Sequence, residues 1–159
     1  MDQKKSMIGV GLRPTHYPEL ESGRTTKVDW FEAVSENYMN SEGRPLKMLL
    51  QIRKSYPIAL HGVGLSIASH DDVSQIYLKK LKSLIERVEP MIVSDHFCWS
   101  SIGGHYSHDL LPFPFNQETL NTICRNVERT QEFLGRQICL ENISYYLKSK
   151  LDEMSEPEL

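Results

Sequence analysis

Short apolar segments alternate along this chain with longer segments in which apolar residues recur at helical spacing. Each apolar run is brief and ends in polar residues, as is typical of strands buried on both faces of a parallel sheet. We therefore predict strands at these runs. They are Met7–Leu12, Val28–Val34, Pro57–Leu60, Met91–Ser94 and Gln137–Leu140.

The segments between the runs have helix signals. Pro45 suits a first helical turn and precedes Leu46, Leu49 and Leu50 on one face. Residues Asp72–Glu89 follow the 3.6-residue period, with Ser69 as a candidate cap. A third helix is expected from a cap at Asn116 to a stop at Gly135. Alternating strands and helices predict βαβ units with right-handed crossovers.

Composition narrows the function classes. Hydrophobic residues make up 40% of the 159 residues and charged residues 25%, so the chain is expected to be globular. A net charge of −3 without a Lys/Arg cluster disfavours nucleic acid as a partner. We also expect no membrane association and a cytoplasmic location, because no signal peptide or long apolar run is recognisable. Cys98, Cys124 and Cys139 are interpreted as reduced thiols, the last two as packing residues.

Metal-ligand types gather where the predicted strands end. In parallel α/β folds, functional groups stand at the carboxyl ends of strands. Imidazole and carboxylate groups suit iron, manganese and zinc, so a shared metal site is one interpretation. The alternative is that each residue is only a hydrogen-bonded loop residue. The residues concerned are His16, Glu36-Asn37, His61, Asp95-His96 and Glu141-Asn142.

Other motifs are weaker. The pairs Gly9-x-Gly11 and Gly62-x-Gly64 lack the third glycine of a dinucleotide-binding fingerprint. Cys98 follows Asp95-His96 closely, but nothing in its surroundings in the sequence indicates an activated nucleophile. His105 and His108 are expected in solvated loops, with a position at the border of the site as the alternative.

Six ordered strings resemble one family over residues 7–147. The strings are Gly11-Leu12-Arg13, Ser35-Glu36-Asn37-Tyr38, His61-Gly62-Val63-Gly64-Leu65-Ser66, Ser94-Asp95-His96 with Trp99, Asp109-Leu110-Leu111-Pro112-Phe113-Pro114 and Glu141-Asn142-Ile143-Ser144. Together they are similar to the multinuclear non-haem iron oxidative enzymes, a bacterial family that includes the oxidase of methanobactin biosynthesis.

The resemblance implies a fold, a cofactor and a reaction. The fold would be a (β/α)8 TIM barrel of the xylose-isomerase-like group, with two or three iron ions in its mouth. The reaction would be oxidation by O2 of cysteines in a ribosomally made precursor peptide, presented by a small partner protein. By position, His61, His96 and Glu141 match the family's iron ligands, with Asn142 beside them. Asp95 and Glu36 would be catalytic residues, Asp95 orienting a ligand and Glu36 lining the site or acting as a base.

The family pattern continues with further ligand-bearing strands that this sequence does not contain. We therefore expect a single incomplete TIM-barrel domain of about five β/α units over residues 1–159, with a disordered N-terminus at 1–6 and an acidic tail at 148–159. Such a chain would hold one iron or none, and whether it is an active enzyme stays open. The alternatives are a non-redox divalent-metal isomerase or hydrolase of the same barrel group, and a non-enzymatic gene remnant.

Overall fold

The computed structural model describes residues 6–144 and 149–159. All five predicted strands are present and form one parallel sheet in the order β1-β2-β3-β4-β7. Their bounds are β1 (Gly9–Gly11), β2 (Trp30–Val34), β3 (Ile58–Gly62), β4 (Ile92–Phe97) and β7 (Cys139–Asn142). Strands β3, β4 and β7 run further than the apolar runs predicted, so each of them includes its polar terminal residues.

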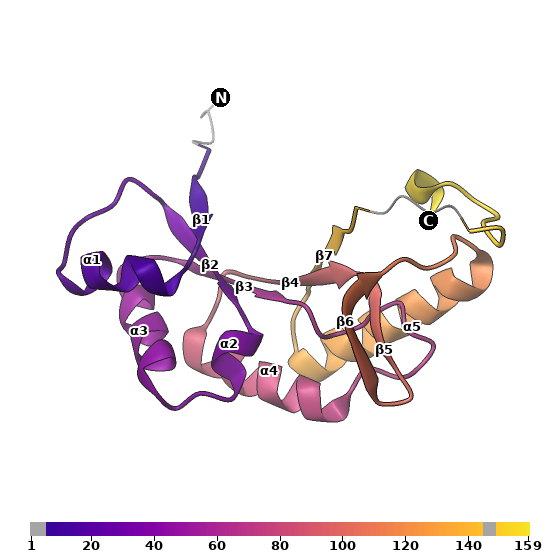
Figure 1. The fold of residues 1–159 in the computed structure, drawn as a ribbon, viewed down its shortest axis with the longest axis horizontal. Coiled ribbons are helices and arrows are strands. Elements are labelled where there is room, and N and C mark those ends of the chain that lie inside the picture. The colour runs from indigo at the N-terminus through magenta and orange to yellow at the C-terminus, as the bar shows by residue number, and fades with distance from the viewer. Residues whose placement is uncertain (1–5, 145–148) are drawn as a thin grey trace.

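Three long helices follow the strands and cover one face of the sheet, as Figure 1 shows. They are α3 (Arg44–Arg53), α4 (Gln75–Val88) and α5 (Gln117–Leu134). The predicted ends of α5 are confirmed, because the Asn116 side chain accepts the Thr119 amide and Gly135 has φ 71°. The predicted start of α4 at Asp72 was wrong: the helix begins at Gln75 and Ser74 caps it, accepting the amide of Tyr77.

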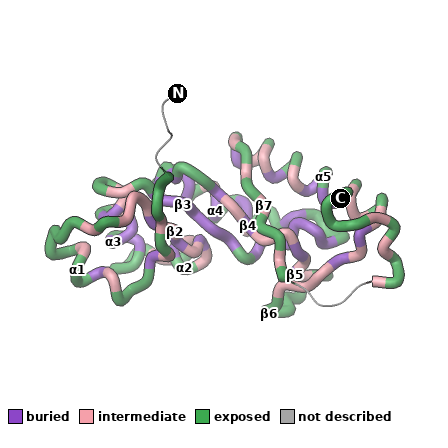
Figure 2. The backbone as a smooth tube through the Cα atoms, turned by 90° about the horizontal axis from the view of Figure 1, so that it is seen from above, coloured by how far each residue is buried: buried purple, intermediate pink, exposed green. Residues whose placement is uncertain are grey.

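The main core lies between the sheet and these helices. Alternate residues of β2 differ in burial: Phe31 and Ala33 are buried against the helices, whereas Trp30, Glu32 and Val34 on the other face are half exposed. Figure 2 shows a second contrast in burial, with buried residues at the centre of the sheet and exposed residues toward its ends. The sheet is therefore a half-barrel whose inner face is open.

Shorter elements were not predicted. The 3-10 helix η1 (Pro14–His16) and the helices α1 (Tyr17–Glu21) and α2 (Glu36–Met39) follow the first two strands. A two-stranded antiparallel hairpin, β5 (Trp99–Ile102) and β6 (His105–Leu111), stands between β4 and α5. The expectation that His105 and His108 lie in loops was therefore wrong, since both belong to β6, although both are exposed there.

The acidic tail packs against the body of the protein. Residues 149–159 contain the 3-10 helix η2 (Glu156–Glu158) and no strand, as predicted. The amides of Glu153 and Met154 donate to the carbonyl of Phe115, and Met154 and Leu159 pack beside a second apolar cluster that contains Phe113. Lys148 and the N-terminal residues 1–5 lie outside the described residues, so the disorder expected at the N-terminus stays a prediction.

Candidate metal centre

Three side chains from three neighbouring strands meet on the inner face of the half-barrel. They are His61 of β3, His96 of β4 and Glu141 of β7. Strand register explains the meeting, because His96 pairs with Glu141 and the position paired with His61 is two residues before His96. The Nε2 atom of His61 lies 3.4 Å from Nε2 of His96 and 3.4 Å from Oε2 of Glu141. All three ligand atoms lie within 4.8 Å of one another, so they can share one ion.

Hydrogen bonds on the far side of each ring assign the tautomers. The Nδ1 atom of His96 lies 3.3 Å from the carbonyl oxygen of Gly62, which can only accept, so Nδ1 carries the proton. The Nδ1 atom of His61 lies 2.8 Å from Oγ of Ser94, which can accept the Nδ1 proton while its own proton goes to the carbonyl oxygen of Leu60 at 3.5 Å. In that tautomer of His61 both Nε2 atoms present lone pairs to the shared space, as in the histidine ligands of metal sites.

This donor set fits a metal ion. Two lone pairs and a carboxylate oxygen at these separations repel one another unless a cation or a proton lies between them. Two imidazoles and one carboxylate suit iron and zinc alike. The burial of the group is graded, with His61 buried, His96 half-buried and the Glu141 side chain 61% exposed. The ion would therefore be fixed from the sheet side and accessible from the side of β7.

A second polar cluster lies on the opposite face of β4. Asp95 is buried, and its carboxylate accepts the amides of His96 at 2.8 Å and Leu65 at 3.2 Å. The hydroxyl of Tyr77 donates to Oε1 of Glu36 at 2.5 Å and lies 3.4 Å from the Asp95 carboxylate. The same Glu36 oxygen accepts the amide of Val63 at 2.8 Å. Asp95 thus contacts the backbone of His96, not its ring.

Burial dominates the electrostatics of this cluster. It raises the pKa of Asp95 to about 7, with a further rise from the charge of Glu36, and hydrogen bonds from backbone amides oppose the rise. Burial also raises the pKa of the Tyr77 phenol far above its usual range, helped by the neighbouring charges of Asp95 and Glu36. Tyr77 therefore stays protonated and acts as a donor, which ties helix α4 to the end of β2.

Five of the predicted strand-end residues do not join the group of three, namely His16, Glu36, Asn37, Asp95 and Asn142. Asn142 follows Glu141 in the strand, so its side chain faces the other way and donates to Oε1 of Glu156 in the tail at 2.9 Å. His16 lies beyond β1, where its Nδ1 atom accepts the amide of Arg13 at 3.2 Å. A catalytic role for Asp95 and Glu36 stays a prediction, and so does a ligand role for Asn142.

Sequence reasoning missed two residues that contact the predicted site residues, Ser94 beside His61 and Tyr77 beside Glu36 and Asp95. Ser94 was seen only as part of a string, although a hydroxyl two residues before a histidine in a strand lies on the same face as that histidine. Tyr77 follows a serine cap by three residues, which places it in the first turn of α4 near the ends of the strands. Both signals were readable once the strand and the helix start were fixed.

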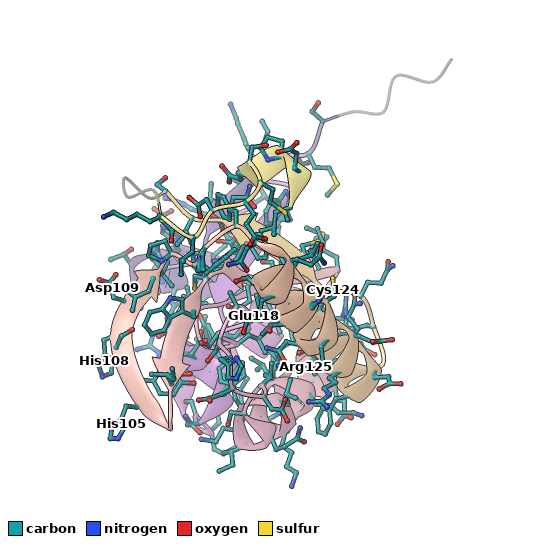
Figure 3. All side chains as sticks on the ribbon, turned by 90° about the vertical axis from the view of Figure 1, so that its right-hand side faces the viewer. His105, His108, Asp109, Glu118, Cys124 and Arg125 are labelled. Carbon is teal, nitrogen blue, oxygen red and sulfur yellow. The ribbon has the colours of Figure 1, made fainter. Side chains whose placement is uncertain are left out.

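The cysteines differ from the prediction in part. Cys98 is fully buried, and burial raises the pKa of its thiol to about 12, with a smaller effect of the Asp95 charge. Cys124 and Cys139 are exposed, so the prediction that they are packing residues was wrong. Figure 3 shows Cys124 on α5, and Cys139 belongs to the edge strand β7, whose inner face is open.

Parallel strands followed by helices, with metal-ligand side chains at the carboxyl ends, define a protein of the TIM-barrel class. The fold resembles that of D-psicose 3-epimerase, a xylose-isomerase-like barrel solved in the presence of D-fructose. The TM-score is 0.55 at 14% identity, over 85% of this chain and 52% of that chain. At that identity the likeness shows the fold alone. The expectation of an incomplete xylose-isomerase-like barrel is confirmed.

The chain belongs to the family described as RiPP precursor modification enzyme MbnB/TglH/ChrH, whose model matches residues 7–159. This match confirms the family resemblance drawn from the sequence. RiPPs are ribosomally made peptides that are modified after synthesis.

Relatives named only "UPF0276 protein" support this assignment. One from Anaeromyxobacter sp. is 49% identical over 150 residues, which is 94% of this chain and 53% of the relative. The relative from Caulobacter vibrioides is 45% identical over 94% of this chain and 53% of its own length. The relative from Vibrio parahaemolyticus is 44% identical over 96% of this chain and 52% of its own length. The chain spans about half the length of these curated relatives. None of the described helices is long and apolar enough to cross a membrane.

Proposed function

We propose that this chain contributes the His61–His96–Glu141 part of the metal site of an iron-dependent oxidase that uses O2 to modify cysteine residues of a ribosomally made precursor peptide. The observation that carries the proposal is the meeting of the three ligand atoms within 4.8 Å. Membership of a family of RiPP precursor modification enzymes supports a peptide substrate. A small protein that presents the peptide is part of the proposal, as is a cytoplasmic location.

The residues of this chain would hold the ion and the substrate in fixed geometry. Ser94 and the carbonyl of Gly62 fix the two rings so that both Nε2 atoms face the ion. When bound, iron supplies a Lewis acid for a cysteine thiolate and electrons for the reduction of O2. Asp95 would act as a positioning residue, because its carboxylate holds the backbone of His96 and the loop after β3. Glu36 would line the substrate side of the site.

A non-redox metal reaction is the second candidate, because two histidines and a glutamate are also a common zinc set. The metal itself separates the two. Zinc retained after purification in the presence of both metals, with no O2 uptake, would favour a hydrolase or isomerase. Iron that is retained and supports O2 uptake would favour the oxidase.

Anaerobic reconstitution tests the site. The chain is loaded with Fe²⁺, desalted and analysed for iron, alongside His61→Ala, His96→Ala and the control His105→Ala. His105, labelled in Figure 3, is an exposed residue of the hairpin and is not one of the three grouped ligands. We expect stoichiometric iron in the wild type and the control, and a loss of at least tenfold in affinity in the two ligand variants. A chain that stays metal-free, or variants that bind as well as the wild type, would refute the proposed centre.

Activity is tested with the rest of the barrel supplied. The chain is combined with the segment of the Anaeromyxobacter relative that it does not match, and O2 uptake is followed with a cysteine-bearing peptide. The same peptide with serine in place of cysteine is the control. Uptake that needs cysteine and His61 supports the oxidase. Equal uptake with both peptides would contradict cysteine modification.

A further inference from the structure

The three proposed ligands are not held equally firmly. His61 and His96 lie on inner strands of the sheet, and a hydrogen-bond partner on the neighbouring strand contacts each ring. Glu141 lies on β7, the last strand of the sheet, which is four residues long and pairs with β4 alone. Within residues 6–144 and 149–159 its carboxylate has no hydrogen-bond donor other than the ring of His61 at 3.4 Å. The position of Glu141 therefore depends on what holds the end of β7.

A side chain at the end of β7 is bonded to a distant part of the chain. Asn142 is the residue after Glu141, and its Nδ2 atom donates to Oε1 of Glu156 in the tail at 2.9 Å. Because neighbours in a strand face opposite sides, Asn142 is held on the side away from the ion while Glu141 faces it. The two residues share one planar peptide unit, so a bond that fixes Asn142 also fixes the backbone that carries the ligand.

Glu156 is itself held, because the tail is anchored to the start of α5. The amides of Glu153 and Met154 donate to the carbonyl of Phe115 at 2.8 Å and 3.1 Å. In return, the amide of Phe115 donates to Oδ1 of Asp152 at 2.8 Å. Figure 1 shows the tail, in yellow, beside the start of α5. A hydrogen bond to Glu156 therefore ties β7 to the body of the protein.

Aromatic rings connect the same region to β4. Asn142 pairs in register with Phe97 at the end of β4, and the ring of Phe97 packs edge-on against that of Phe113 at 4.9 Å. Phe113 in turn packs against Phe115 at 5.6 Å. Asn142 and Glu156 line one narrow gap together with these three rings. The end of β7 is therefore held from two sides, by β4 and by the tail.

We propose that the Asn142–Glu156 hydrogen bond positions the metal ligand Glu141, which makes Asn142 and Glu156 positioning residues of the metal centre. This assignment rests on the proposed function, since it takes His61, His96 and Glu141 to hold an ion. It gives Asn142 a role on the outer side of the sheet, in place of the ligand role that the resemblance implies. Partners beyond the ligands change metal affinity by roughly 10- to 100-fold. The bond is exposed and acts through the backbone, so its effect belongs at the lower end of that range.

Metal binding to the chain separates positioning from ligation. Co²⁺ is titrated anaerobically into the wild type and its variants, and its visible absorption reports both affinity and coordination. We expect Asn142→Ala and Glu156→Ala each to lower the affinity by roughly tenfold. The double variant should lose no more than either single variant, because both remove the same bond. If Asn142 bound the ion directly, Glu156→Ala would bind like the wild type and Asn142→Asp would bind more tightly, and either result overturns the proposal.

A reversed pair tests the hydrogen bond itself. Asn142→Asp alone places two carboxylates side by side and should weaken Co²⁺ binding at least as much as Asn142→Ala. Adding Glu156→Gln supplies an amide donor opposite the new carboxylate, so the pair should recover most of the lost affinity. Glu128→Ala removes an exposed carboxylate from α5 and is the control, which should bind like the wild type. A reversed pair that binds no better than Asn142→Asp would overturn the assignment.

Hydrogen exchange tests the connection without any ion. In EDTA, the amides of the peptide that contains β7 should exchange roughly two- to tenfold faster in Glu156→Ala than in the wild type, which is the net effect of one hydrogen bond. Peptides from β2 should be unchanged. Faster exchange in a chain that binds no metal would support the positioning of Glu141 and refute the metal centre. Metal binding that depends on His61, combined with unchanged exchange in Glu156→Ala, would keep the metal centre and overturn this assignment.

Discussion

The Nδ1 atom of His61 lies 2.8 Å from Oγ of Ser94, its register partner on the neighbouring strand. With a metal on Nε2 the ring would donate from Nδ1 to this hydroxyl, whose own proton can go to the carbonyl of Leu60 at 3.5 Å. A neighbour that fixes the tautomer of a histidine in this way raises its affinity for a metal ion, because Nε2 is left unprotonated and directed at the shared space.

Removing this hydroxyl should therefore weaken metal binding without removing a ligand. We expect Ser94→Ala to lower the affinity for Fe²⁺ or Co²⁺ by roughly 10- to 100-fold. Ser94→Thr, which keeps the hydroxyl, should recover most of the loss, and Ser107→Ala on the hairpin should have no effect. Anaerobic titration gives the three affinities. Equal affinity in Ser94→Ala and the wild type would mean that Ser94 does not orient the ring.

The positions of the strands could be predicted from the sequence because each is a short apolar run in a sheet covered by helices. Parallel strands place their carboxyl ends at one edge, so position alone indicated a polar site there, and the family resemblance selected His61, His96 and Glu141 from the strand-end residues. Strand alternation could also have separated Asp95 from His96, and Asn142 from Glu141, because neighbours in a strand face opposite sides. The prediction grouped these pairs by proximity in sequence and missed that difference.

The hairpin was not predictable in the same way. The residues of β6 are mostly exposed, so its sequence has no apolar run that would indicate a strand. What holds it are contacts between distant residues. The hydroxyl of Tyr106 bonds to the carbonyl of Gly64, and the side chain of Ser66 accepts the amides of Ser100 and Ser101. Such pairings are set by tertiary structure.

Thiol labelling tests the exposure of the three cysteines. We expect iodoacetamide at pH 8 to alkylate Cys124 and Cys139 in the folded chain, because both are exposed. Cys98 should resist until denaturant is added, because it is buried and its raised pKa keeps the thiol protonated. Mass spectrometry of peptides after brief labelling gives the order. Early labelling of Cys98 would contradict the core described around it.

The buried carboxyl of Asp95 should make stability depend on pH. Its pKa is raised from 3.8 to about 7, first by burial, so the protonated form is favoured in the folded state. This stabilisation is complete below pH 3.8 and is lost as the pH rises through 7. Relative to Asp95→Asn, the unfolding free energy of the wild type should therefore fall between pH 4 and 8.

Urea unfolding of the metal-free protein in EDTA measures this difference at each pH. The control is Asp72→Asn, which removes an exposed carboxylate on the loop before α4. Its unfolding free energy should change with pH in the same way as that of the wild type. A constant difference between the wild type and Asp95→Asn over this range would show that the carboxyl is ionised throughout.

Gly62 lies opposite Asp95 in the register of β3 and β4, and the space beside it is filled. A Cβ at Gly62 would lie 2.3 Å from Oδ2 of Asp95 and 2.8 Å from the hydroxyl of Tyr77. We expect Gly62→Ala to lower the unfolding free energy by about 1–3 kcal/mol, because a packed region must shift to accept the methyl group. Gly11→Ala, whose Cβ meets only the Arg13 side chain at 3.7 Å, should change it by less than about 0.5 kcal/mol.

A double-mutant cycle identifies the cause of the Gly62 effect. If crowding against Asp95 is responsible, Gly62→Ala should cost less in an Asp95→Ala background than in the wild type, with a coupling of about 0.5–3 kcal/mol between the two sites. Chemical unfolding of the four proteins at pH 7 gives the coupling. Costs that simply add would mean that the methyl group is accommodated elsewhere, and that the Asp95 carboxylate does not fill the space beside Gly62.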